Sequence, residues 1–96
     1  MTTIKIDDMV KIRNDIDPEI SGKVVRLVLP GPADVDSISF DESAPFSQDP
    51  MFTVWAQLSQ EDYMKLKDQR GPQFAFNTLP ELPNTVISVK NRGVIL

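Results

Sequence analysis

Residues 9–29 read MVKIRNDIDPEISGKVVRLVL, and this stretch contains two strand patterns separated by a turn. In residues 9–13, Val10 and Ile12 fall on one face of an extended chain, as in a strand with one buried face. Residues 23–29 are apolar on both faces, which is typical of a strand in the interior of a sheet. Asn, Asp and Pro residues between the two patterns supply turn chemistry. The stretch therefore predicts two neighbouring strands, the second of them central.

The rest of the chain adds short strands and one helix. Ser59 is a good helix N-cap, and Gly71 followed by Pro72 stops a helix, which predicts one short helix over about residues 59–70. Apolar alternation predicts further strands at residues 51–58, 73–77, 85–89 and 93–96, the last two as a hairpin with its turn at 90–93. The pattern favours a mainly β domain, a small barrel of five or six short strands with one short helix. A helix packed on one face of an open sheet is the rival architecture.

The composition is that of one globular domain without the usual catalytic side chains. The 96 residues are 41% hydrophobic and 25% charged, which fits a single domain over residues 1–96. There is no Cys and no His, which removes thiolate nucleophiles, the usual general base and the common ligands of zinc and iron–sulfur sites. No apolar run is long enough for a membrane helix, and no signal peptide is visible. We expect a cytoplasmic, non-enzymatic protein with no cofactor, no metal and no membrane partner.

The net charge of −4 originates in one segment. Residues 30–50, PGPADVDSISFDESAPFSQDP, contain Asp and Glu but no Lys or Arg, whereas the remainder of the chain is nearly neutral. Binding to a phosphate backbone requires clustered Lys and Arg, so we expect no nucleic-acid partner. The segment is rich in Pro and has no clear pattern of its own, which predicts a long acidic loop. Loops of this length are usually functional or disordered.

The first third of the chain carries a family resemblance. Residues 6–13, IDDMVKIR, and residues 22–27, GKVVRL, separated by a short charged segment, resemble the opening of SH3-like barrels of the KOW type. The sequence departs from that motif at Asp7, where the family usually has Gly, and at Val24 or Val25, one of which replaces a second Gly. The resemblance implies a small SH3-like β-barrel. Such barrels serve as RNA-binding, protein-docking and subunit-accessory modules, so the fold alone leaves the function open.

The acidic segment is also the candidate site, because it carries apolar side chains among its charges. Ile38, Phe40 and Phe46 lie among acids and prolines, so they either pack on the barrel or bind a partner. Trp55 is either a core residue or an exposed aromatic platform of the kind that SH3-like barrels use for peptides. The predicted partner-binding residues are Asp34, Asp36, Ile38, Phe40, Asp41, Glu42, Phe46 and Trp55.

These features predict a protein-binding accessory or inhibitor that docks through loop 30–50 and the strand face around Trp55. In size and charge the chain is similar to small bacteriophage proteins, which would place it in the host cytoplasm or in the virion. The alternative is a self-assembling structural protein, a virion component or symmetric oligomer. For residues 30–50 themselves, the alternative to docking is a solvated, mobile excursion without a partner, and a weaker hypothesis is an acidic mimic of nucleic acid. A calcium loop is not expected, because EF-hand spacing would need a ligand at Ile38 and Gly at Ser39.

Overall fold

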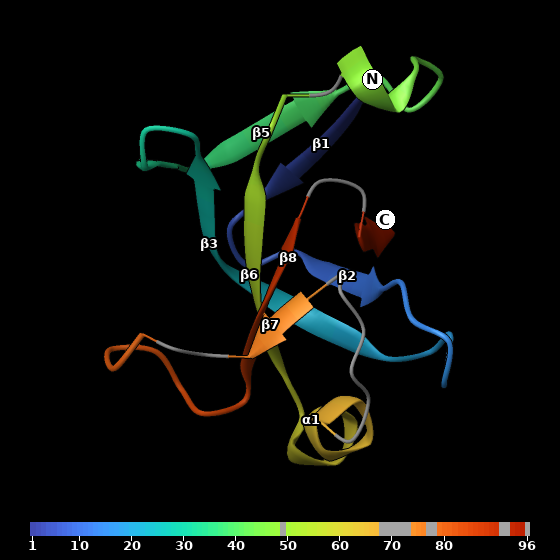
Figure 1. Ribbon diagram of the computed structural model, residues 1–96, viewed down its shortest axis with the longest axis vertical. Helices are drawn as coiled ribbons and strands as arrows, with labels where there is room; N and C mark the ends of the chain where they lie inside the picture. Colours follow the sequence, from blue (N-terminus) through green and yellow to red (C-terminus); the bar gives the residue numbers. More distant parts are fainter. Residues whose placement is uncertain (49, 68–73, 77–78, 91–92, 96) are drawn as a thin grey trace.

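The computed structural model describes residues 1–48, 50–67, 74–76, 79–90 and 93–95, and these form a mainly β domain (Figure 1). Its larger sheet has seven antiparallel strands and curls strongly into a half-barrel. A second sheet has two antiparallel strands. One short α-helix lies beyond the end of the larger sheet, far from the two-stranded sheet. The prediction of a mainly β domain with one short helix is confirmed.

The strand order of the larger sheet is β7-β8-β6-β3-β2-β9, with β4 paired to β3, and the smaller sheet is β1-β5. The elements are β1 Thr2–Lys5, β2 Met9–Ile12, β3 Ser21–Leu29, β4 Ala33–Val35, β5 Ser37–Phe40, the 3-10 helix Phe46–Gln48, β6 Thr53–Leu58, α1 Gln60–Lys67, β7 Phe74–Phe76, β8 Val86–Lys90 and β9 Val94–Ile95.

Strand β3 organises the larger sheet. It pairs with β2 near its beginning, with β6 along most of its length and with β4 at its end. The register with β6 shifts between Val24 and Arg26, a β-bulge of the kind that bends a strand and increases its twist. Because of this bend, one continuous strand pairs with β2 at one end and with β4 at the other end of a curled sheet (Figure 1). The prediction that residues 23–29 form a central strand is confirmed.

The core fills the inside of the half-barrel and includes side chains from both sheets. Val10 and Ile12 are buried as their alternation predicts, and every second residue of β6 points inward. The buried apolar side chains are Ile4, Val10, Ile12, Ile20, Val24, Leu27, Ile38, Phe40, Phe52, Val54, Ala56, Leu58, Leu66, Val86, Ile87, Val89 and Val94.

Helix α1 begins where the sequence predicts. The Ser59 hydroxyl accepts a hydrogen bond from the Asp62 amide at 3.1 Å, which satisfies one of the free donors of the first turn. Leu66 is fully buried and attaches the helix to the core, while Lys65 reaches Asp17 in the turn before β3. The predicted stop at Gly71 and Pro72 lies outside the described residues.

The predicted hairpin of residues 85–89 and 93–96 is wrong. Strand β8 pairs with β6 and β7, whereas β9 pairs with β2 at the opposite end of the sheet. The Arg13 amide extends that contact by donating to the Gly93 carbonyl at 2.8 Å. Pairing with β2 buries Val94 in the core and covers a strand edge that would otherwise be open.

The prediction of a continuous loop over residues 30–50 needs correction, because the segment contains β4 and β5. Ile38 and Phe40 are only 5% and 6% exposed, and they alternate with exposed Ser37 and Ser39. Strand β5 pairs with β1, so that Ile38 lies opposite Ile4. The apolar side chains of this segment therefore complete the core, since a two-residue period lets one face be buried while the other stays in water.

Candidate functional site

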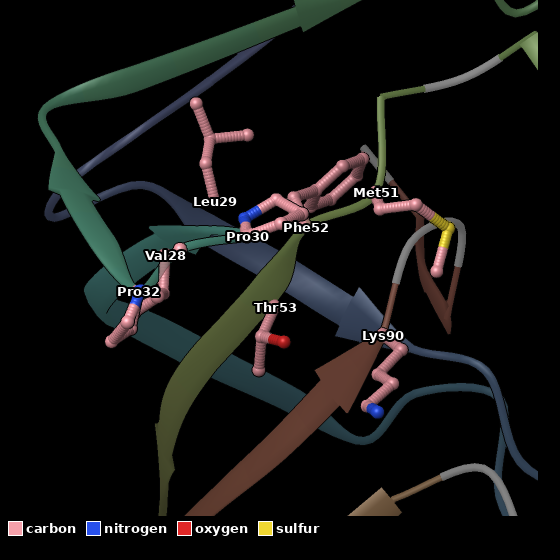
Figure 2. A pocket seen from close by; sticks show the side chains of 9 residues that line it. Val28, Leu29, Pro30, Pro32, Met51, Phe52, Thr53 and Lys90 are labelled. Atoms are coloured by element: carbon pink, nitrogen blue, oxygen red, sulfur yellow. The ribbon is translucent and has the colours of Figure 1, made fainter.

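A cavity of about 310 Å³ lies where the β3–β4 turn meets the start of β6 and the end of β8 (Figure 2). This volume is at the lower end of the range of ligand pockets. Its lining residues are Val28, Leu29, Pro30, Gly31, Pro32, Met51, Phe52, Thr53 and Lys90. They come from three segments that are distant in the sequence, and the sheet register brings them together.

One wall of the pocket is a tight turn with little conformational freedom. Leu29 of β3 pairs with Ala33 of β4, which leaves a three-residue connection. Pro30 and Pro32 fix their own φ angles, and Gly31 between them adopts a positive φ of 107°, which L residues rarely adopt. The wall is therefore shaped before any ligand arrives.

An ion pair holds this turn against the sheet. Arg26 Nε lies 2.7 Å from Asp34 Oδ1, and Arg26 Nη2 lies 3.3 Å from Asp34 Oδ2. This hydrogen-bonded contact lowers the pKa of the Asp34 carboxyl below its ordinary value and raises the pKa of Arg26. Both side chains are partly exposed, so the pair serves mainly to set the position of β4.

One residue of the pocket lining, Phe52, also belongs to the core. Phe52 is 3% exposed, and its ring stacks on Phe40 of β5 with centroids 5.7 Å apart and an interplanar angle of 29°. Such pairs add stability beyond their buried area. Phe40, which the sequence suggested as a contact residue, thus supports the pocket from below.

The rim is polar on the side of β8. Thr53 of β6 pairs with Lys90 at the end of β8, and Figure 2 shows the two side chains on adjacent strands. Lys90 is exposed, and it is the one ionisable residue of the described lining. Met51 adds an apolar rim and is 61% exposed. The pocket thus combines apolar walls with a single positive charge.

Two of the predicted site residues lie near this pocket. Trp55 is half-buried in β6, where it pairs with Arg26 on one side and Ser88 on the other. Asp34 is exposed and bound to the same Arg26. The outer face of the sheet therefore brings Asp34 and Trp55 to a common neighbour.

None of the other predicted residues with a described side chain lines the pocket. Ile38 and Phe40 are buried and present no surface to a partner, which removes them from the contact set. Asp41 accepts hydrogen bonds from the amide and hydroxyl of Ser43, at 3.0 and 2.7 Å, and so shapes its own turn. Asp36 and Glu42 are exposed. Phe46 begins the 3-10 helix, and the position of its side chain lies outside the described part of the structure.

The described residues contain no constellation for metal binding. No group of three or more Asp, Glu, His or Cys side chains in that part of the chain is arranged to hold an ion. In the same part, no helix has the length and apolar character needed to cross a membrane.

The pocket could not be predicted from the sequence, because its lining residues come from three separate segments, residues 28–32, residues 51–53 and Lys90. One local signal was available: Pro30, Gly31 and Pro32 lie between apolar residues, as in a short strand connection. The alternation of Ser37, Ile38, Ser39 and Phe40 marks a further strand. The pairing of Thr53 with Lys90 has no such signal, since it joins residues far apart in the chain.

Comparison of the chain with models of protein families, with curated proteins and with solved structures gave no match.

Proposed function

We propose that this protein is a non-enzymatic protein-binding module built as an SH3-like barrel, and that it docks through the pocket and the adjoining outer face of β6. The path β8-β6-β3-β2-β9 in a curled sheet supports this architecture, because β9 pairs with β2 of the segment that resembles SH3-like barrels, residues 6–29. The docking surface differs from the one expected from sequence, because Ile38 and Phe40 support the core.

The observation that carries the proposal is a preformed apolar pocket beside a half-buried tryptophan. Thr53 lines the pocket, and Trp55 is two residues further along the same face of β6, about 7 Å away. Preformed pockets flanked by aromatic side chains are typical anchors of protein interfaces, because the apolar contact is gained with little loss of conformational freedom.

The proposal is tested by capture from a lysate of the source organism with matched variants. Thr53→Trp places a bulky, uncharged side chain in the pocket. Thr2→Trp makes the same change on β1, outside the pocket lining and outside β6, and both positions are half-buried. We expect a partner that wild type and Thr2→Trp retain and Thr53→Trp loses, and circular dichroism should show that all three proteins are folded. Equal capture by all three proteins, or no partner with any, would contradict the proposal.

Self-assembly is a second candidate, favoured by the small sheet. In the described part of the chain, β1 and β5 pair only with each other. Each strand of such a ribbon has an outer edge that can accept another strand. Sedimentation at high micromolar concentration tests this function: a discrete oligomer would support it, and a monomer would reject it.

A further inference from the structure

Resting on the proposed docking function, we infer that the pocket binds an acidic peptide segment of a partner protein, with an apolar side chain in the cavity and a neighbouring carboxylate at Lys90. The inference comes from the charge of the lining. Among its described residues, Lys90 is the one charged side chain and no carboxylate is present, although the whole chain has a net charge of −4.

The charge of Lys90 is available to a ligand. Arg26 is neutralised by Asp34, and Lys65 lies 3.3 Å from Asp17 and 3.6 Å from Glu61. No described residue forms an ion pair with Lys90, and its side chain is exposed at the rim (Figure 2). A carboxylate placed there would gain a charge-assisted hydrogen bond without displacing an internal one.

The cavity itself selects an apolar side chain. Apart from Thr53 and Lys90, its lining is apolar and includes the Pro30–Pro32 turn, Val28 and Leu29. An aliphatic or aromatic group that enters the cavity is removed from water on several sides. Burial of apolar surface is the dominant favourable term in most protein association. The Thr53 hydroxyl beside Lys90 can donate to the same carboxylate or accept from the peptide backbone.

A peptide fits this surface better than a nucleic acid does. One lysine at an apolar pocket cannot follow a row of phosphates, which needs several cations in sequence. A peptide that fills the pocket can continue along the outer face of β6, where Trp55 offers contact area to its next residues.

Two short peptides with blocked ends provide the probes. One contains a leucine followed by two aspartates, and the other has two lysines in place of the aspartates. We expect wild type to bind the acidic peptide about fivefold more tightly, which is the scale of one exposed ion pair. Lys90→Glu should reverse this preference. The control Lys23→Glu changes another exposed lysine, on β3 outside the lining, and should keep it.

The measurement is a titration followed by NMR chemical shifts, read at the lining residues and at Trp55. Equal affinity for the two peptides, an unchanged preference in Lys90→Glu, or no binding of either peptide would overturn the inference. A partner captured equally by wild type and Lys90→Glu but lost by Thr53→Trp would overturn the carboxylate contact alone and leave the docking function standing. If Thr53→Trp also retained the partner, the docking function itself would fail.

The chain's own residues 41–48 also combine Asp, Glu and Phe, so a second copy is the competing occupant. The mass of the protein is therefore measured by sedimentation without peptide. An oligomer that dissociates in Lys90→Glu and persists in Lys23→Glu would replace the separate partner by a second copy and so overturn the inference. A monomer in all three proteins would support it.

Discussion

Asp7 adopts a backbone conformation that L residues rarely take. Its φ is +75°, and its amide donates to the Val24 carbonyl at 2.8 Å, while the next carbonyl, of Asp8, accepts from the Val24 amide at 2.9 Å. These two bonds attach the turn between β1 and β2 to β3. Glycine adopts a positive φ without strain, whereas a side chain at this position adds a steric cost.

Substitution of Asp7 therefore tests the cost of that conformation. Asp7→Gly should raise the free energy of unfolding by about 0.5 kcal/mol, because relief of strain exceeds the added freedom of the unfolded chain. Asp7→Val should lower it by about 1–2 kcal/mol, because a β-branched side chain is disfavoured at positive φ. Urea unfolding measures both values. A valine variant as stable as the glycine variant would show that φ at this position has no energetic consequence.

Asp17 links a turn to the helix, and its protonation state matters for stability. Its carboxylate accepts the Glu19 amide at 2.9 Å and the Lys65 ammonium at 3.3 Å, which together lower the pKa of Asp17 below its ordinary 3.8. A lowered pKa in the folded state contributes stability that is present above the unfolded pKa and is lost as the pH falls through the folded pKa.

Asp17→Asn should accordingly be less stable than wild type at about pH 7, and the difference should shrink below about pH 4. The loss is small, because the group is exposed and solvent screens the pair. Urea unfolding at about pH 7 and pH 3 provides the comparison. Asp15→Asn removes one negative charge from the same turn and serves as the control. A difference between wild type and Asp17→Asn that stays constant with pH would contradict this account.

At the scale of elements, Gly22 lies where β3 is paired with both β2 and β6. It pairs with Val10 of β2 and with Leu58 of β6. A Cβ atom at this position would lie 2.9 Å from Leu58 Cδ2 and 3.0 Å from the Ala56 Cβ. Gly22 lies inside β3, and its missing side chain allows β6 to approach.

Gly22→Ala should therefore destabilise the sheet without changing its topology. We expect a loss of about 1–3 kcal/mol, the usual cost of an added group in a well-packed core. In the Leu58→Ala background, Gly22→Ala should cost less stability than it does in wild type. The reason is that Leu58→Ala removes the nearest clashing atom. Thermal unfolding of the four proteins completes the cycle. Additive losses would contradict the steric explanation.

Elements with a local signal were predictable from the sequence, and pairings between distant elements were not. The strands β2, β3 and β6 and the N-terminus of α1 follow from periodicity and from the Ser59 cap. The partner of β9 does not follow from the sequence, because residues 85–96 taken alone favour a hairpin. In the structure β9 instead pairs with the open edge of β2. The strand β5 was also not predicted. Its two-residue alternation is short, and the acidic residues around it made residues 30–50 resemble a loop.

The pocket was less predictable than the sheet for the same reason. It depends on the pairing of Thr53 with Lys90 and on the β3–β4 turn, which involve separate parts of the chain. Of the residues singled out from sequence, Trp55 lies two positions beyond Thr53 and Asp34 helps to place the turn. Phe40 contributes only through its stacking on Phe52. A site assembled from distant segments is visible only once the register is known.

For the whole molecule, the contact of β9 with β2 joins the end of the described chain to its first half. Val94 is 5% exposed and lies opposite Ile12, which is fully buried. Small domains usually unfold in one cooperative step, so the loss of contacts at one strand is felt throughout the sheet. Trp55 is the one tryptophan of the chain and reports on β6, which is separated from β2 by β3.

Val94→Ala should lower the free energy of unfolding by about 1–3 kcal/mol through the lost burial and the cavity left behind. For a domain of this size, 1 kcal/mol corresponds to roughly 4–8 °C in Tm. Trp55 fluorescence and far-ultraviolet circular dichroism should shift together, because β9 and β6 belong to one cooperative unit. The same truncation at half-buried Val35, on β4, should cost less. A fluorescence transition that stays in place while the circular dichroism transition shifts would mean that β9 frays alone, and the pairing of β9 with β2 would then contribute nothing to the stability of the rest of the sheet.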